Sequence, residues 1–179
     1  WICEDFRQQF YYILLMAGLQ PVFLLRATFS KIMQEVFFKM KKYNVGIVGA
    51  TGMVGQRFAT LLENHPWFTV TALAASSRSA GKPYREAVAK RWAMKTGIPA
   101  SMADMVVYDA QADIEKIVSK VDFVFCAVDM KKDEIRALEE MYAKHECPVI
   151  SNNSANRSTP DVPMIIPEIN AAHAAVIPA

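Results

Sequence analysis

Three glycines recur at three-residue intervals in the first third of the chain. Gly49, Gly52 and Gly55 stand in the sequence GATGMVG. A first glycine allows a tight turn after a strand, a second lets a phosphate group approach the backbone, and a third lets a helix pack closely on the strand. Free N–H groups at the start of such a helix attract an anion. Glycine triplets also occur in turns that bind nothing, so the flanking residues decide the interpretation.

The residues on both sides of this turn have the required patterns. Residues 45–48 are an apolar, mostly β-branched run, which is typical of a buried strand. Apolar residues then recur at helical spacing from Val54 to Leu62, and Pro66 ends the pattern. The order strand, glycine turn, helix predicts a binding site for the pyrophosphate of a dinucleotide.

The loop after the next strand indicates which dinucleotide is bound. Residues 76–82 follow the apolar run 70–75 and read SSRSAGK. An acidic residue here would accept a hydrogen bond from the ribose of NAD, whereas this loop is basic and rich in hydroxyl groups. We therefore predict NADP, with charge-assisted hydrogen bonds to its 2′-phosphate. The candidate residues are Ser76, Ser77, Arg78, Ser79 and Lys82. The alternative interpretation is an ordinary solvated loop.

The elements that position these loops alternate in the order expected of βαβ units. After the first two strands and the first helix, the sequence predicts a weakly helical stretch at 84–95, strands at 105–108, 123–128 and 148–150, and helices at 113–120 and 135–144. The predicted fold class is α/β, with a Rossmann-like, doubly wound and mostly parallel sheet.

The N-terminal residues 1–39 do not fit this pattern. The segment 10–25 is apolar, but it contains Pro21, follows acidic residues, and is shorter than a membrane-spanning helix needs. Met40 precedes an orderly strand, as an initiator would. We expect residues 1–39 to be extraneous or poorly ordered and residues 40–179 to form an NAD(P)-binding domain. A membrane anchor or a helix that contacts a partner is the alternative.

Composition excludes several classes of protein. The net charge of +2 gives no single-sign field of the kind that binds nucleic acid. Three cysteines without CxxC spacing argue against a disulfide framework and a zinc site. We expect a cytoplasmic protein with a small-molecule substrate, no metal ion, no nucleic-acid partner and no membrane association.

Four motifs together resemble one enzyme family. They are the turn VGIVGATGMVG, the loop SSRS, the segment SNNSANR at 151–157 and the segment PEIN at 167–170. From Lys41 to the end, the chain is similar to the aspartate-semialdehyde dehydrogenases, nearer to their archaeal and fungal branch. This family reduces β-aspartyl phosphate with NADPH through a thioester on a cysteine, in the pathway to lysine, threonine, methionine and isoleucine.

The resemblance implies roles for individual residues. Thr51, Gly52, Met53 and Val54 would hold the pyrophosphate, and residues 76–79 would hold the phosphate of the adenosine. Ala127 and Asn152 would line the path to the nicotinamide. Arg157 corresponds to the family's arginine that binds the substrate phosphate, a task that suits a guanidinium because its planar fork donates two parallel hydrogen bonds. An ordinary surface arginine is the alternative.

The family's nucleophilic cysteine and its base histidine are expected beyond the end of this chain. The cysteine follows an asparagine somewhat after PEIN, and neither Cys126 nor Cys147 has that context. We predict that both are buried structural thiols. No catalytic role is assigned to His65, His145 or His173. The chain would then be the cofactor-binding part, truncated before a second domain, and inactive alone, whereas whole family members are expected to be homo-oligomers.

Two other interpretations remain open from the sequence. Within enzymes, the chain could be part of another NADP-dependent reductase of an activated acyl group, such as N-acetyl-glutamyl-phosphate reductase or malonyl-CoA reductase. Outside enzymes, it could be a non-catalytic NADP-binding module that senses the cofactor.

Overall fold

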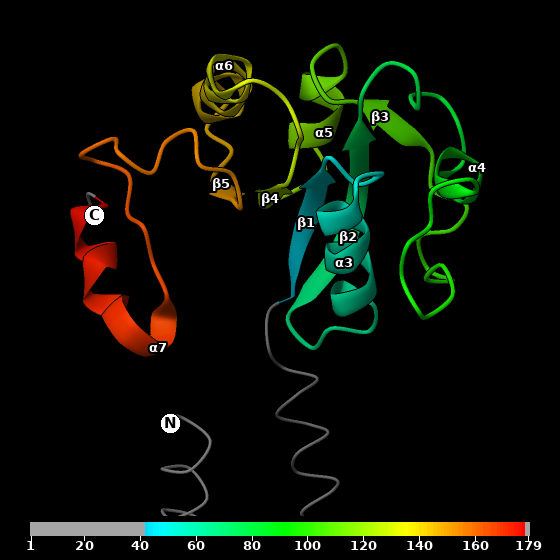
Figure 1. The fold of residues 1–179 in the computed structure, drawn as a ribbon, viewed down its shortest axis with the longest axis horizontal. Coiled ribbons are helices and arrows are strands. Elements are labelled where there is room, and N and C mark those ends of the chain that lie inside the picture. Colours follow the sequence, from blue (N-terminus) through cyan, green and yellow to red (C-terminus); the bar gives the residue numbers. More distant parts are fainter. Residues whose placement is uncertain (1–41, 178–179) are drawn as a thin grey trace, which may run out of the picture. The chain divides into compact units, whose positions relative to one another are not determined.

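Five apolar runs form one parallel sheet in a computed structural model that describes residues 42–177. The neighbouring strands pair in the order β3-β2-β1-β4-β5, and all four pairings are parallel (Figure 1). The strands are β1 (Tyr43–Val48), β2 (Phe68–Ala75), β3 (Val107–Asp109), β4 (Phe123–Cys126) and β5 (Val149–Ser151). The chain returns to the middle of the sheet after β3, so the strand order reverses between β1 and β4.

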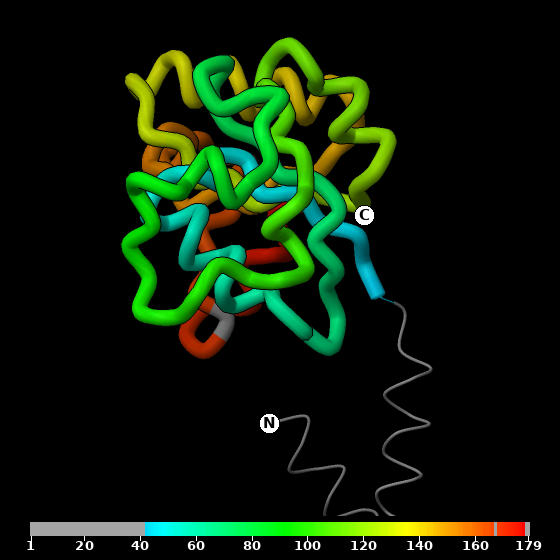
Figure 2. The backbone as a smooth tube through the Cα atoms, turned by 90° about the vertical axis from the view of Figure 1, so that its right-hand side faces the viewer, coloured from blue at the N-terminus to red at the C-terminus, as the bar shows by residue number. Residues whose placement is uncertain are grey.

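Helices connect the strands and follow the last of them. The sheet helices are α3 (Met53–Leu62), α4 (Tyr84–Val88), α5 (Ile114–Val118) and α6 (Lys132–Lys144). A short helix α7 (Pro167–Asn170) and a 3-10 helix η1 (Ala171–Val176) come after β5. The backbone path from β1 to η1 can be followed in Figure 2.

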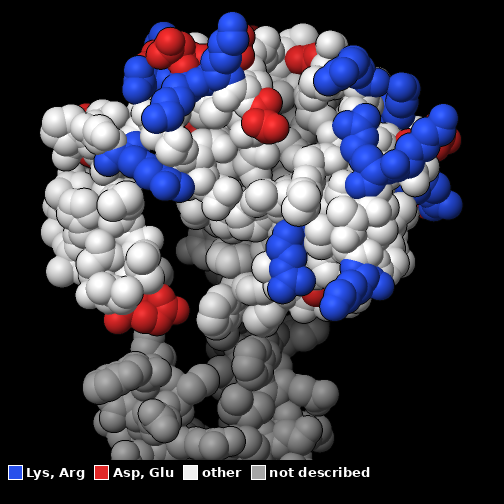
Figure 3. Space-filling view, viewed as in Figure 1, with Lys and Arg blue, Asp and Glu red and all other residues white. Residues whose placement is uncertain are grey.

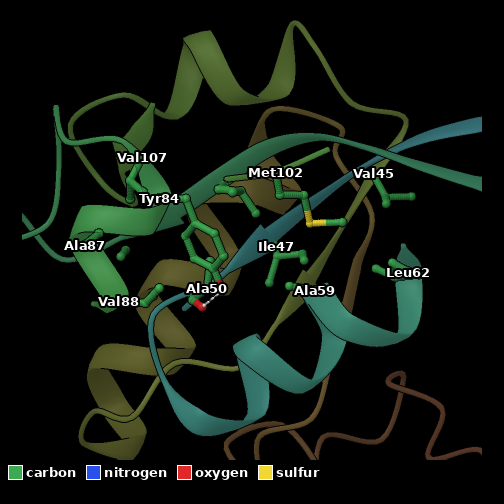
Figure 4. Close-up of a cluster of buried hydrophobic side chains, with 12 residues drawn as sticks. Val45, Ile47, Ala50, Ala59, Leu62, Tyr84, Ala87, Val88, Met102 and Val107 are labelled. Atoms are coloured by element: carbon green, nitrogen blue, oxygen red, sulfur yellow. Dashed lines mark hydrogen bonds between the residues drawn. The ribbon is translucent and has the colours of Figure 1, made fainter. Parts of the chain in front are cut away.

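Each face of the sheet is covered by its own pair of helices. Alternate residues of a strand point to opposite faces. Ile47 packs in a cluster with residues of α3 and α4, and its neighbour Val48 packs in a second cluster with residues of α5 and α6. Figure 4 shows the first cluster, in which Tyr84 and Val88 of α4 approach Ile47 and Ala50. This is the predicted doubly wound, Rossmann-like arrangement.

The structure confirms the predicted strands and helices of the sheet and corrects their extents. Only 84–88 of the weakly helical stretch 84–95 is a helix, because the chain then departs from helical geometry to bond with α3: Ala93 N–H donates to the side chain of Gln56. The strand predicted at 123–128 ends at Cys126. The expectation for residues 1–39 falls outside the described part of the chain. Within 42–177, no helix is long and apolar enough to cross a membrane.

Two glycines, Gly49 in the turn after β1 and Gly55 in the first turn of α3, cannot carry a side chain. Gly49 has a φ of +89°, and a Cβ atom there would lie 2.5 Å from the carbonyl oxygen of Ala127. At Gly55 a Cβ atom would collide with the carbonyl oxygen of Gly49. Backbone atoms cannot move aside as the tip of a flexible side chain can. The turn, the first turn of α3 and the residue after β4 are therefore packed backbone against backbone.

We expect Gly55→Ala to lower the free energy of unfolding by about 1–3 kcal/mol, because the added methyl group overpacks this contact. Gly97→Ala is the matched control, since a Cβ atom at Gly97 meets nothing within 4 Å. It should stay within about 0.5 kcal/mol of the unchanged protein. Urea denaturation followed by circular dichroism measures both. Equal effects of the two substitutions would contradict the packing described for Gly55.

Candidate functional site

A cleft of about 780 Å³ opens at the carboxyl ends of the strands. Its walls come from the segments that follow β1, β2, β3, β4 and β5. In open parallel sheets, ligands bind in such a crevice at the point where the strand order reverses. The volume lies in the range of ordinary small-molecule sites. Ten predicted cofactor residues line it: Gly49, Thr51, Gly52, Met53, Val54, Ser76, Ser77, Arg78, Ala127 and Asn152.

The start of α3 borders this cleft. The first N–H groups of a helix have no partner one turn earlier. Gly52 occupies the N-cap position, contributes no side chain to cap those groups, and is followed by a first turn without an acidic residue. The helix dipole therefore meets the cleft with its positive end uncompensated. A pyrophosphate is chemically suited to this place.

Two buried side chains hold the glycine turn from behind. The Tyr84 hydroxyl donates to the carbonyl oxygen of Ala50 over 2.8 Å (Figure 4). The side-chain amide of Gln56 donates to the carbonyl oxygen of Thr51 and to that of Arg91, each over 3.0 Å. Gln56 is 1% exposed and Tyr84 is fully buried, and burial raises the pKa of the Tyr84 hydroxyl. The carbonyl oxygens of Ala50 and Thr51 thus accept hydrogen bonds from buried side chains.

Of the five residues in the loop after β2 that were predicted to bind the adenosine phosphate, three line the cleft and two do not. Ser76, Ser77 and Arg78 line the cleft, and all three are exposed. Ser79 and Lys82 do not line the cleft. Ser79 is buried, and Lys82 donates through Nζ to the carbonyl oxygen of Arg78 over 2.9 Å. Lys82 thus contacts the loop backbone. Figure 3 shows Lys and Arg side chains gathered over the side of the molecule that carries α4.

The opposite end of the cleft is formed by the segments after β4 and β5. Ala127 and Asn152 line it, and the N–H of Asn152 donates to the carbonyl oxygen of Cys126 over 2.9 Å. Arg157 is exposed and does not line the cleft, but its guanidinium donates to the carbonyl oxygen of Asn152 over 3.2 Å. One hydrogen bond leaves most of the five guanidinium donors available.

Several residues of the cleft were missed by the sequence analysis. Asp109 ends β3, Ala110 and Gln111 follow it, and all three could have been found, since every parallel strand of this sheet ends at the same edge. Asp129 and Met130 follow β4 in the same way. No sequence pattern places Arg91 at the cleft, because it follows a helix and not a strand. It lies there in a non-helical segment whose Arg91 carbonyl oxygen accepts a hydrogen bond from Gln56 of α3.

The two described thiols are buried, as predicted, and neither lines the cleft. Burial raises the pKa of the Cys126 thiol to about 12, and the nearby Glu139 carboxylate adds to this shift. Burial also raises the pKa of Cys147. In the described part of the chain, no cluster of His, Cys, Asp and Glu is arranged to hold a metal ion. Residues 42–177 thus supply a binding cleft and no activated thiol.

We expect iodoacetamide at pH 8 to leave Cys126 unmodified in the folded protein and to modify it fully in 8 M urea. A thiol with a pKa near 12 carries only about one thiolate in 10⁴ molecules at this pH, and the thiolate is the reactive form. Peptide mass spectrometry follows each cysteine separately, with the urea sample as the control for intrinsic reactivity. Modification of folded Cys126 within minutes would contradict its burial.

The chain is similar in sequence to several aspartate-semialdehyde dehydrogenases. The model of the semialdehyde dehydrogenase NAD-binding domain matches residues 44–177. The aspartate-semialdehyde dehydrogenase of Methanothermobacter thermautotrophicus is 47% identical over 127 residues, which cover 71% of this chain and 34% of that protein. That of Aspergillus fumigatus is 39% identical, over 76% of this chain and 36% of the relative.

The chain is also similar to solved structures of aspartate-semialdehyde dehydrogenases. The Candida albicans aspartate-semialdehyde dehydrogenase, solved with NADP, has a TM-score of 0.69 and 36% identity, over 75% of this chain and 36% of that one. A Vibrio cholerae aspartate-semialdehyde dehydrogenase II complexed with ASA has a TM-score of 0.56 and 25% identity, over 76% and 39%. This chain spans about a third of the length of these relatives. It belongs to the semialdehyde dehydrogenase family and carries that family's NAD-binding domain.

Proposed function

We propose that this chain is the NADP-binding part of an aspartate-semialdehyde dehydrogenase. The observation that carries the proposal is the end of β2, where Arg78 lines the cleft beside Ser76 and Ser77 and no acidic residue follows the strand. A carboxylate there would favour NAD, whereas a guanidinium with hydroxyl groups suits a 2′-phosphate. The similar Candida albicans enzyme, solved with NADP, supports the same choice.

The residues around the cleft fit a dinucleotide. The backbone of Thr51 and Met53 offers N–H groups to the pyrophosphate at the start of α3. The N–H of Gly52 donates to the carbonyl oxygen of Gly49, and the part of Gly52 is to let a phosphate approach without meeting a Cβ atom. Residues 76–78 bind the adenosine phosphate. Ala127 and Asn152 then border the nicotinamide end. When bound, the cofactor supplies a hydride, and the chain's own contribution is to bind it and hold it in one orientation.

The substrate end of the site requires an anion-binding group. Arg157 serves this purpose, because its guanidinium can donate in parallel to two phosphoryl oxygens while it keeps its bond to the Asn152 carbonyl. The reaction proposed for the whole protein interconverts β-aspartyl phosphate and aspartate semialdehyde through a cysteine thioester. Since Cys126 and Cys147 are buried outside the cleft, we assign the nucleophile to the part of the relatives that this chain does not match.

We expect Arg78→Ala to weaken NADP binding by at least about tenfold and to leave NAD binding within about twofold, because only NADP carries the 2′-phosphate that the guanidinium would bind. Isothermal titration calorimetry with both cofactors measures this. Arg57→Ala is the matched control, since Arg57 is an exposed arginine of α3 that does not line the cleft, and its removal changes the net charge equally.

The control should bind both cofactors as the unchanged protein does. A chain that binds NAD as tightly as NADP, or an Arg78→Ala variant that loses both cofactors equally, would contradict the role of Arg78. Absence of binding to either cofactor would contradict the proposed function itself.

A further inference from the structure

A buried carboxylate lies beneath the loop that follows β5. Glu139 of α6 is only 7% exposed, which is rare for a glutamate. Three side chains, one from the last residue of β5 and two from the loop after it, donate hydrogen bonds to it. Ser151 Oγ and Asn153 Nδ2 donate to Oε1 over 2.5 and 3.3 Å, and Asn156 Nδ2 donates to Oε2 over 2.7 Å. Both carboxylate oxygens are therefore engaged by one short stretch of chain.

The same face of α6 holds this loop at a second point. Arg136 lies one turn before Glu139 and donates to the carbonyl oxygen of Ala155 over 2.9 Å and to Oδ1 of Asn156 over 3.4 Å. The amide of Asn156 is thus fixed at both ends, by an acid through its nitrogen and by a base through its oxygen. A carboxylate removed from water needs several good donors. This loop provides them.

The loop that Glu139 holds carries the two groups assigned to the nicotinamide and the substrate. Asn152 lies between Ser151 and Asn153, which both donate to Glu139, and it lines the cleft. Arg157 follows Asn156 and donates to the carbonyl oxygen of Asn152. Beyond Ser151, the loop has no regular structure until α7. Asn152 keeps one backbone hydrogen bond, from its N–H to the carbonyl oxygen of Cys126, and the stretch from Asn153 to Asn156 is held to α6 by side-chain hydrogen bonds.

Glu139 does not line the cleft, although its neighbour Leu138 does. Its effect on a ligand must act through the loop. A neutral residue of similar shape would offer one acceptor oxygen and one NH₂ group, and the NH₂ group would face the amide donors of Asn153 or Asn156. A donor that faces a donor in a buried site leaves both unsatisfied. The loop would then move away from α6.

We propose that Glu139 is a positioning residue, whose buried carboxylate fixes residues 151–157 so that Asn152 lines the nicotinamide end of the cleft and Arg157, bonded to the Asn152 carbonyl oxygen, lies beside it. The inference rests on the proposed function. It assigns a purpose to a buried charge that stability alone does not require, because a well-packed apolar residue is often as stabilising as a buried charge with its partners. The adenosine end, formed after β2, shares no hydrogen bond with Glu139.

The test compares two ligands that differ at the nicotinamide end. NADP contacts the whole cleft, whereas 2′-phospho-ADP-ribose has the same adenosine phosphate and pyrophosphate but no nicotinamide. We expect Glu139→Gln to raise the Kd of NADP by about fivefold or more and to leave the Kd of 2′-phospho-ADP-ribose within about twofold. A general loss of structure would weaken both ligands together, so the ratio of the two values isolates positioning.

Glu140→Gln is the matched control, because Glu140 is the next residue of α6, is exposed, and loses the same charge. It should leave both Kd values unchanged. Asn156→Ala removes a donor from the loop side without altering α6, and it should reproduce the selective loss if Glu139→Gln does not fold. Equal changes for both ligands, or no change in either variant, would overturn the role of Glu139. Failure of the unchanged protein to bind either ligand would instead overturn the proposed function.

Discussion

The site depends on the way the peptide groups of one glycine turn are oriented. The carbonyl groups of Ala50 and Thr51 accept hydrogen bonds from buried side chains of Tyr84 and Gln56. A buried carbonyl without such a partner would cost the full penalty of its desolvation. These bonds tie the turn to α3 and α4, whose apolar residues cover one face of the sheet. The turn is therefore fixed by the core before any ligand binds, and the N–H groups that start α3 stay available to an anion.

The order of the strands then spreads the binding groups along one edge. β1 and β4 lie at the reversal point, with the loop of Arg78 beyond β1 and the loop of Asn152 beyond β4. A dinucleotide laid across this edge has its pyrophosphate at the centre and its two ends over different loops. The two loops are held in different ways. The loop after β2 is held by a bond from Lys82 to the Arg78 carbonyl oxygen and by backbone hydrogen bonds to Val107 of β3, and the loop after β5 is held by a carboxylate and a guanidinium on α6. Because different contacts hold the two loops, a substitution can alter one end of the cleft without altering the other.

Much of this arrangement could be predicted from local patterns. The glycine spacing between a β-branched run and a helical run predicted the turn and the helix that follows it, because both depend on neighbours in the sequence. The basic loop after β2 was predicted in the same way, although Lys82 contacts the loop backbone and does not line the cleft. Groups that act across long sequence separations could not be predicted. Arg91 reaches the cleft through a hydrogen bond to Gln56, and Glu139 meets the loop only because α6 packs beside β5.

The most direct test of the account is a titration of the isotopically labelled protein with NADP, followed by the amide signals in two-dimensional ¹H–¹⁵N NMR spectra. A pyrophosphate bound at the start of α3 would shift the amide signals of Thr51, Gly52, Met53 and Val54 most, while the buried amides of Val45 and Ile47 in β1 would change little. Saturable shifts centred on the turn are the predicted result. Binding that shifts other regions and leaves the turn amides unchanged would contradict the central claim, because the glycine turn would then be structural only.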